Sequence, residues 1–365
     1  MKHLGDVCTI VNGGTPDTAV SEYWGGTHLW ITPAEMGKRS SPYAGDTKRK
    51  ITELGLRNSS ATMLPINSVI LSSRAPIGHL IINTLPMATN QGCKGLVPAA
   101  NLQPKFLYYY LQSIVQLLDS MGSGATFKEI STGKLKQIRI PLAPRPEQRR
   151  LVGILDQAFA AIATAKANTK ENLQNARALK QSAVHLMLSA NTPSWTHTKI
   201  GKQIVLQRGF DITKVEQKPG SVPVVSSGGI KSYHSSAMAQ APGVVLGRKG
   251  TLGKVYYLET DFWPHDTTLW VKQFNGNDPK FVYHFLANLD VSGLDSGAAN
   301  PALNRNQVHP IEIDWPPISD QKLIAQRLDS IDTQTQSLQS LYRRKLAALD
   351  ELKKSLLHQA FSGNL

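Results

Sequence analysis

Residues 138–156 read IRIPLAPRPEQRRLVGILD, and residues 311–329 read IEIDWPPISDQKLIAQRLD. They begin a stretch that the chain contains twice, at residues 138–191 and 311–364, with no gap between the aligned copies. Thirteen positions are identical at a constant offset of 173. Because a longer and much less similar segment precedes each copy, we expect a duplicated unit with a constant part and a variable head.

Each copy has the hydrophobic pattern of a long helix. Apolar or small residues follow one another in alternating steps of four and three, which is the spacing of a coiled-coil seam, and both copies keep the same phase. The predicted seam includes Leu151, Leu155, Ile162, Asn172, Leu179, Ile324, Leu328, Leu338, Lys345 and Leu352. We predict that the two helices interdigitate, with the polar residues Asn172 and Lys345 fixing their register. Two amphipathic helices inside a larger helical domain are the alternative.

The length of the helices predicts their direction. A helix from Leu151 to Leu186 reaches about 54 Å, whereas a compact segment the size of residues 192–317 has a radius of gyration of about 14 Å. Because such a segment cannot easily carry the chain back along the whole helix, we expect the second helix to return antiparallel. One variable head would then lie at each end of the helical pair, and the chain would be pseudo-twofold symmetric.

The two variable heads, residues 1–143 and 192–317, contain short apolar runs separated by Gly, Asn and Pro. This pattern is typical of an α+β fold with short strands. We therefore predict two globular α+β domains joined by two long antiparallel coiled-coil helices. The helices are expected within residues 144–191 and 318–365.

A weaker similarity links the two heads. The matching segments are Leu4-Gly5 and Ile200-Gly201, Arg74 with Gly78 and Arg248 with Gly253, and Lys105-Phe106-Leu107-Tyr108 and Lys280-Phe281-Val282-Tyr283. We interpret the heads as divergent copies of one fold, in which Arg74 and Arg248 are equivalent.

The charge balance indicates a polyanionic partner. The chain has 40 Lys and Arg against 26 Asp and Glu, which leaves a formal charge of +14 and a pI near 9.7. The excess is +10 in residues 1–192 and +4 in residues 193–365. Nucleic acid is the leading candidate, and we expect the first half to bind phosphate more strongly.

The cysteine content and the N-terminal segment indicate the compartment. Cys8 and Cys93 are too few for a disulfide framework and lack the spacing of a zinc site. The N-terminal residues do not form an apolar signal segment, and no continuous apolar run approaches the roughly 20 residues that cross a bilayer. We expect a cytoplasmic protein that does not associate with membranes.

Basic residues in the heads lie beside Gly, Ser and Asn, where loops are expected. Such loops can bind phosphates through Lys and backbone amides, and Arg can pair with guanine. The candidate DNA contacts of this kind are Lys48, Arg49, Lys50, Arg74, Lys128, Lys134, Arg248, Lys249 and Lys254. Solvated surface is the alternative for the run at 48–50, and capping of a local carbonyl is the alternative for Arg74.

Candidate base readers follow the two arginines in sequence. They are Asn90, Gln91, His265 and Asp266. Amides read adenine, and carboxylates accept hydrogen bonds from cytosine. Turn formation is the simpler role for Asn90 and Asp266.

The sequence indicates no catalytic residue, metal or cofactor. The stretch Gly247–Lys254 superficially resembles a phosphate-binding loop, but its spacing is wrong by one residue and Val255 stands where Ser or Thr should bind magnesium. Asp211 and Glu216 have the residue types of a metal-dependent nuclease, which is one alternative function. A coiled-coil scaffold with incidental charge is the other. We expect a noncatalytic DNA-binding protein whose partners carry out the chemistry.

Two sets of motifs are recognisable. The first set consists of Pro141–Gln148 with Leu155-Asp156, and of Pro316-Pro317 with Asp320-Gln321 and Leu328-Asp329. The second set consists of Thr15-Pro16, Tyr23–Gly26, Trp30–Pro33, Gly124–Ser131 and Gly247–Lys254. They resemble, respectively, the central and distal repeats and the target recognition domains of type I restriction-modification specificity subunits.

This resemblance implies that residues 1–143 and 192–317 are target recognition domains, each reading one half of a gapped, asymmetric site in double-stranded DNA. It also implies that the helices act as a spacer on which two methyltransferase subunits dock, and that motor-nuclease restriction subunits join this complex. Half-sites one DNA turn apart, about 34 Å, leave an unread gap. One departure from the family pattern is Asn300–Asn304, which stands where the first copy has Gly124–Lys128.

Overall fold

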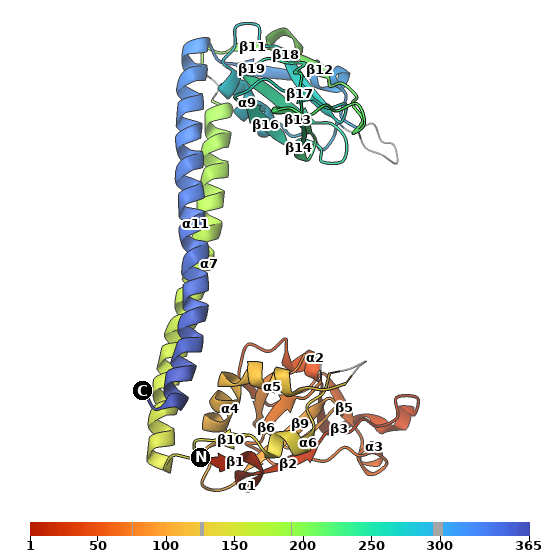
Figure 1. The fold of residues 1–365 in the computed structure, drawn as a ribbon, viewed down its shortest axis with the longest axis vertical. Helices are drawn as coiled ribbons and strands as arrows, with labels where there is room; N and C mark the ends of the chain where they lie inside the picture. The colour runs from red at the N-terminus through yellow and green to blue at the C-terminus, as the bar shows by residue number, and fades with distance from the viewer. Residues whose placement is uncertain (75, 125–127, 191, 295–301) are drawn as a thin grey trace. The chain divides into compact units, whose positions relative to one another are not determined.

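The computed structural model describes residues 1–365 with the exception of residues 75, 125–127, 191 and 295–301 (Figure 1). Two of the motifs quoted above are affected by this limit. Residues 125–127 of the first turn and residues 300–301 of the second lie outside the described residues, as does Asn191 of the repeat.

The chain divides into two compact units. Unit 1 consists of Met1–Thr169 and Arg344–Leu365, and unit 2 consists of Lys170–Arg343. Each unit contains one head and a segment of both long helices, α7 (Arg145–Leu188) and α11 (Ile318–Ser362).

The first head is built on short strands in unit 1. A five-stranded sheet has the order β2-β9-β6-β7-β4, a three-stranded sheet has the order β5-β3-β8, and β1 pairs with β10. The strands are β1 (Lys2–His3), β2 (Cys8–Asn12), β3 (Trp24–Ile31), β4 (Tyr43–Ala44), β5 (Arg49–Ile51), β6 (Val69–Ser72), β7 (Leu80–Asn83), β8 (Met87–Thr89), β9 (Cys93–Pro98) and β10 (Arg139–Ile140). Val69, Ile70 and Leu71 are fully buried, as expected for a continuous apolar run in a central strand.

Short helices complete the first head. They are α1 (Leu4–Val7), the 3-10 turn η1 (Ser21–Tyr23), α2 (Pro33–Met36), α3 (Glu53–Arg57), α4 (Pro104–Ser113), α5 (Val115–Met121) and α6 (Thr132–Lys136). The hydroxyls of Thr32, Thr52 and Ser131 cap α2, α3 and α6 by accepting hydrogen bonds from backbone amides in the first turn.

The second head, in unit 2, has a four-stranded sheet of order β12-β18-β15-β16, a three-stranded sheet of order β14-β13-β17, and the pair β11-β19. Its strands are β11 (Thr196–Lys199), β12 (Val205–Arg208), β13 (Val222–Ser226), β14 (Gly229–His234), β15 (Gly243–Gly247), β16 (Val255–Leu258), β17 (Trp263–Pro264), β18 (Thr268–Gln273) and β19 (Glu312–Trp315). Its helices are α8 (Ile200–Gln203), α9 (Pro279–Ala287) and α10 (Arg305–Val308).

The two heads share one topology. The antiparallel order β2-β9-β6-β7 in unit 1 corresponds to β12-β18-β15-β16 in unit 2. In the second sheets, β3 pairs with β5 antiparallel and with β8 parallel, and β13 pairs with β14 antiparallel and with β17 parallel. This agreement confirms the α+β class and the interpretation of the heads as copies of one fold.

Within each unit, the segments of α7 and α11 run antiparallel (Figure 1). In unit 1, Arg150 Nη2 donates to the carbonyl of Leu365 at 2.8 Å, and Lys166 Nζ lies 2.5 Å from Asp350 Oδ1. In unit 2, Lys180 pairs with Asp332 at 2.6 Å, and Val184 belongs to the same buried cluster as Leu328. In both units the residue number on α11 therefore falls as the number on α7 rises. Among the described residues, neither these nor any other helices are long and apolar enough to span a membrane.

The buried face of these helices departs from the predicted seam. Leu151, Leu155, Ile162, Ile324 and Leu328 are at most 9% exposed. Farther along, Leu179, Leu338 and Leu352 are 72%, 42% and 47% exposed, and Asn172 and Lys345 are also exposed. The seam prediction is wrong at these five positions, so the polar pair does not fix a register between the helices.

The cause of this departure is the period of the helix. A heptad seam assumes 3.5 residues per turn, whereas a straight α-helix drifts by about 20° per heptad relative to that repeat. On α11 the buried or half-buried positions include Ile324, Leu328, Ile331, Thr335, Gln339, Tyr342, Leu346, Leu349, Lys353, Leu357 and Ala360. The contact face thus follows the 3.6-residue period. It still includes Tyr342 and Leu349 of the 4-3 pattern, but it lies one residue beyond that pattern at Gln339, Leu346, Lys353, Leu357 and Ala360.

A duplicated glutamine joins each head to its helix. In unit 1, Gln148 Oε1 accepts from the amide of Gln103 at 2.8 Å, and its Nε2 donates to the carbonyls of Asn101 at 2.9 Å and Ala143 at 2.7 Å. The equivalent bonds in unit 2 join Gln321 to the amide of Asp278 (2.9 Å), to Asn277 Oδ1 (2.7 Å) and to the carbonyl of Pro316 (2.9 Å). Both glutamines are buried, so each one satisfies backbone groups that would otherwise lack partners.

A duplicated aspartate makes a second connection. Asp156 Oδ2 lies 2.7 Å from Lys105 Nζ and Oδ1 accepts from the hydroxyl of Tyr109. Burial lowers the pKa of Lys105, but the hydrogen bond to Asp156 and the charge of that carboxylate, together with the nearby Tyr43, outweigh burial and raise the pKa. In unit 2, Asp329 Oδ1 lies 2.8 Å from Nε2 of the buried His284. Each head therefore contacts its helix through the aspartate of the repeat.

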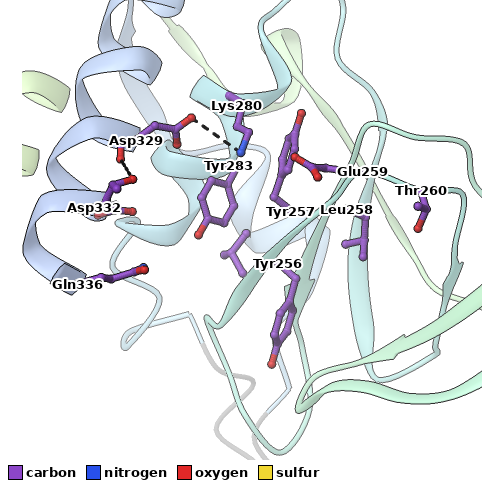
Figure 2. Close-up of a pocket in the computed structure, with 12 residues that line it drawn as sticks. Tyr256, Tyr257, Leu258, Glu259, Thr260, Lys280, Tyr283, Asp329, Asp332 and Gln336 are labelled. Carbon is purple, nitrogen blue, oxygen red and sulfur yellow. Dashed lines mark hydrogen bonds and ion pairs between the residues drawn. The ribbon is translucent and has the colours of Figure 1, made fainter. Parts of the chain in front are cut away.

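In unit 2 this connection borders an open hollow of about 650 Å³ between β16, α9 and α11. Figure 2 shows Lys280 beside Asp329 of α11 and Tyr257 of β16. Lys280 Nζ is 3.8 Å from Asp329 Oδ2 and 4.0 Å from the centre of the Tyr257 ring. Because these contacts engage the lysine from two sides, the hollow belongs to the junction of head and helix.

Candidate nucleic-acid interface

The loops after β6 and β15 contain the two arginines that the sequence singled out. The carbonyl of Ser73 accepts from the amide of Ile130 at 3.0 Å, and the carbonyl of Arg248 accepts from the amide of Leu303 at 2.9 Å. Both bonds join the loop to the residue just before the cap of a short helix, α6 or α10. Ser73 and Arg248 therefore occupy equivalent places.

The predicted equivalence of Arg74 and Arg248 is wrong by one residue. Isolated bridges pair Arg74 with Glu129 and Lys249 with Ala302, so Arg74 corresponds to Lys249. The error arose from matching the two arginines by residue type. Gly78 and Gly253 are equivalent, since their amides donate to the carbonyls of Ser72 and Gly247 at the ends of β6 and β15, but Arg74 lies four residues before its glycine and Arg248 lies five before. Since neighbouring residues in extended backbone point to opposite sides, Arg74 and Arg248 face different surroundings.

Arg74 is held in a network of three charges. Its Nε lies 2.7 Å from Glu129 Oε2, and Lys94 Nζ lies 3.2 Å from Glu129 Oε1. Burial raises the pKa of Glu129, but the hydrogen bonds from Arg74 and Lys94 and the charges of these two cations together outweigh burial and hold the pKa below its ordinary value. The Arg74 side chain remains 42% exposed, so one face of the guanidinium is open to solvent.

The second head lacks this network. Leu269 occupies the position of Lys94, because the two residues pair with equivalent positions of the equivalent strands β15 and β6. Ala302 occupies the position of Glu129. Among the described residues, Lys249 therefore has no carboxylate partner, although its backbone position matches that of Arg74.

Asn90 forms a turn, and Gln91 is exposed. Asn90 Oδ1 accepts from the amide of Gly92 at 2.8 Å, and its Nδ2 donates to Thr15 Oγ1 at 2.8 Å. The amide of Asn90 is thus occupied inside the head. Gln91 points to solvent and keeps its side-chain amide available.

His265 and Asp266 contact each other. His265 is buried, and its Nδ1 lies 3.0 Å from Asp266 Oδ1 and 3.1 Å from Thr267 Oγ1. Asp266 Oδ2 lies 3.1 Å from Arg208 Nη2. Backbone bonds place Asn90 and His265 equivalently, since their amides donate to Ile31 of β3 and Val225 of β13.

The basic run of the first head is exposed on and beside β5. The guanidinium carbon of Arg49 lies 3.6 Å from the centre of the Trp24 ring, which orients the cation while leaving it open to solvent. Lys48 donates its backbone amide to the Glu35 carboxylate at 3.2 Å, and its side chain is exposed. Lys50 is also exposed.

The remaining lysines have local partners. Lys128 Nζ lies 2.7 Å from Asp119 Oδ2. Lys134 Nζ donates at 2.7 Å to a carbonyl at the end of α5. Lys254 Nζ lies 5.2 Å from the centre of the Tyr256 ring. Among these three side chains, Lys134 therefore has the clearest structural role.

The residues considered for a nuclease do not form one group. Glu216 accepts hydrogen bonds from the amide and hydroxyl of Thr213 at 2.7 and 2.8 Å. Asp211 instead lies with His265 and Asp266, whose possible ligand atoms are within 4.8 Å of one another. Because Asp266 is already paired with Arg208, the local charge of this group is partly neutralised.

Sequence reasoning missed Arg208 and Arg305, which lie near Arg248 around a cleft in unit 2. Neither arginine belongs to a basic run, and neither recurs at the offset of 173 residues that relates the two long helices. The only signal was the glycine after Arg208, which marks a close turn: a Cβ on Gly209 would lie 2.1 Å from the carbonyl oxygen of His265.

Comparisons with known proteins agree with the fold. A family model described as Type I restriction modification DNA specificity domain matches residues 1–175 and 200–343. The Type I restriction enzyme EcoprrI specificity subunit of Escherichia coli is 24% identical, over 94% of this chain and 90% of that protein. The Type I restriction enzyme MjaIX specificity subunit of Methanocaldococcus jannaschii is 32% identical over 157 residues, which span 42% of this chain and only 36% of that protein.

Solved structures show the same fold. A chain from a study of complex assembly and conformational transition of the type I R-M system has a TM-score of 0.80 at 17% identity, covering 100% of this chain and 97% of that one. The HsdS subunit from Thermoanaerobacter tengcongensis has a TM-score of 0.67 at 17% identity, with coverage of 100% and 96%.

Proposed function

The chain belongs to the type I restriction-modification DNA specificity family, and from this premise we propose that it reads a bipartite, gapped sequence in double-stranded DNA. Specificity subunits are noncatalytic components of restriction-modification complexes. In this proposal, residues 1–143 and 192–317 are the target recognition domains. Residues 144–191 and 318–365 form the spacer between them.

One observation most directly supports the proposal that the two heads read different half-sites. The heads have the same strand order, but the loops that end their sheets contain different side chains. Where the first head has Arg74 and Glu129, the second has Lys249 and Ala302. A common backbone with different loop chemistry is what reading two unlike half-sites requires, because base edges are distinguished by side-chain donors and acceptors.

We propose DNA contacts for the basic and polar residues of these loops. They are Lys48, Arg49, Lys50, Arg74, Asn90, Gln91, Lys128, Lys134, Arg248, Lys249, Lys254, His265 and Asp266. Lys50, Gln91 and Lys249 are favoured within this set because their side chains are exposed and have no partner in the described part of the chain. Arg49 and Arg74 are exposed but oriented, by Trp24 and Glu129 respectively, which favours contacts of defined direction.

The partners in this proposal are two methyltransferase subunits, with restriction subunits joining through them. Both long helices expose leucines that the paired helix does not cover. They are Leu179, Leu186, Leu323, Leu338, Leu341 and Leu352, between 42% and 72% exposed. Exposed apolar side chains on a helical surface are typical of protein interfaces. Because the helices are duplicated, two equivalent subunits fit this surface better than one.

The decisive experiment is selection of bound fragments from random duplexes by the chain in complex with its methyltransferase subunits. We expect two short motifs separated by a constant number of unread base pairs. Recovery of one continuous motif, or of no motif from a complex that binds DNA, would contradict the proposal.

A further inference from the structure

A cleft of about 750 Å³ in unit 2 is lined by three arginines from three separate elements. Arg208 ends β12, Arg248 follows β15, and Arg305 begins α10. Phe210 and Asp211 complete one side of the cleft. Only one of these arginines belongs to the candidate DNA contacts named above.

The cations of this cleft are incompletely neutralised. Arg208 is paired with Asp266 at 3.1 Å. Arg248 donates to the carbonyls of Leu303 and Asp266, each at 3.3 Å, and has no ion pair among the described residues. Arg305 is exposed and likewise has no ion pair in the described part of the chain. Burial and the nearby Arg208 cation lower the pKa of Arg248, so an anion in the cleft would relieve repulsion.

The first head has short polar residues at all three positions. Asn12 of β2 pairs with Lys94, and Arg208 of β12 pairs with Leu269. Because Lys94 and Leu269 are equivalent, Asn12 occupies the position of Arg208. Thr132 follows the cap of α6 as Arg305 follows the cap of α10. The third position, that of Arg248, is filled by a serine at 73, which is fully buried.

In the first head two of these short side chains bond to each other, whereas the buried Ser73 hydroxyl has no hydrogen-bond partner among the described residues. Thr132 Oγ1 donates to Asn12 Oδ1 at 2.7 Å. Three replacements by arginine at positions that meet in one place give the second head a concentrated positive cleft. Such a coincidence points to a ligand, because three converging cations without full neutralisation are unfavourable for folding alone.

We propose that this cleft binds one phosphodiester group of the DNA backbone, and that the second head alone has this contact. The proposal rests on the proposed function. Two N–H groups of Arg248 already donate to backbone carbonyls, which orients the guanidinium and leaves its other donors for the ligand. A phosphate offers acceptors to donors arriving from several directions, whereas a guanine edge is planar and takes one bidentate arginine. The contact positions the head without reading sequence.

The test replaces the three arginines with the side chains of the first head. The variants are Arg208→Asn, Arg248→Ser, Arg305→Thr and the triple variant, each in the full chain with its methyltransferase subunits. The matched control is Lys272→Gln, which removes an exposed cation of β18 outside the cleft. Affinity is measured by fluorescence anisotropy for the selected duplex and for duplexes altered at each specific base. Each measurement is repeated at salt concentrations from about 50 to 300 mM.

We expect the triple variant to bind all duplexes roughly tenfold or more weakly, as for loss of charge-assisted hydrogen bonds. The slope of log affinity against log salt should fall by about 0.9, the value for one phosphate. Lys272→Gln should leave both quantities nearly unchanged. Arg305→Thr alone, which alters an exposed residue, serves if the triple variant does not fold by circular dichroism.

Three outcomes would overturn the assignment. Unchanged affinity would remove the cleft from the DNA interface, and a loss confined to one base would make it a base-reading site. Displacement of the duplex by ATP beyond that by salt of equal ionic strength would assign the cleft to a free nucleotide. If the wild-type complex shows no sequence preference at all, the proposed function fails instead, independently of the cleft.

Discussion

At the scale of single residues, the two heads stabilise the same loop junction by opposite means. In the first, the buried Lys94 and the half-exposed Arg74 share the Glu129 carboxylate. In the second, Leu269 and Ala302 take the places of Lys94 and Glu129. A buried cation without its partner is costly, whereas an apolar pair at the same place is tolerated. The charged pair Lys94 and Glu129 and the apolar pair Leu269 and Ala302 are therefore both stable arrangements, whereas a buried lysine beside an alanine is unfavourable.

This difference predicts that Glu129→Ala destabilises the chain and that adding Lys94→Leu restores much of the loss. The single variant leaves Lys94 uncompensated while only 8% of its side chain is exposed, which costs about 1–3 kcal/mol. The double variant copies the second head. Urea unfolding followed by circular dichroism measures both, and equal stability of the single and double variants would contradict the coupling.

The pKa of Glu129 predicts how the stability lost in Glu129→Ala depends on pH. The folded pKa of Glu129 lies below its ordinary value, so its stabilisation is complete above the unfolded pKa of about 4.3. The stabilisation disappears as the pH falls through the folded pKa. The difference between wild type and Glu129→Ala should therefore be largest near neutral pH and shrink in acid below about pH 4.

At the scale of elements, the sequence predicted what depends on local pattern and missed what depends on exact geometry. Apolar periodicity and proline entry predicted the two long helices, and the weaker similarity between the heads predicted their common topology. The heptad phase failed at Leu179 and Leu338 because small angular errors add up along a long helix. The match of Arg74 to Arg248 failed because the two loops, which have equal length, carry their arginines at neighbouring and not at equivalent positions. Arg208 and Arg305 were missed because the fold alone brings them together.

The period of α11 can be tested by substituting two leucines of the predicted seam. Leu328 is 1% exposed and Leu338 is 42% exposed. We expect Leu328→Ala to cost about 2–5 kcal/mol through lost burial and cavity formation. Leu338→Ala should change the stability by about 0.5 kcal/mol or less. Both are measured as free energies of unfolding in urea, and similar costs at the two positions would support a heptad seam after all.

At the scale of the whole molecule, neither head is complete without segments distant in sequence. The core of unit 1 includes Phe361 near the end of α11, whose ring lies 5.2 Å from that of Phe106 and 5.4 Å from that of Tyr110. The core of unit 2 includes Val184 of α7 together with Leu328 of α11. Because both helices contribute to both units, a change of length in one helix alone disturbs the packing of the pair. Lengthening the pair requires matched changes in both helices.

The proposed spacer role predicts that such a matched change alters the gap and nothing else. Residues 163–169 of α7 lie opposite residues 347–353 of α11 in unit 1, as the pair Lys166 and Asp350 shows. Duplicating both segments adds about 10 Å to the helical pair, equivalent to roughly three base pairs at 3.4 Å each. Selection from random duplexes should then return the two original motifs with a longer gap. Duplicating residues 163–169 alone is the control, and it should lower stability because the two helices lose their register. New motifs at the old spacing would show that the helices influence recognition without setting the distance between the half-sites.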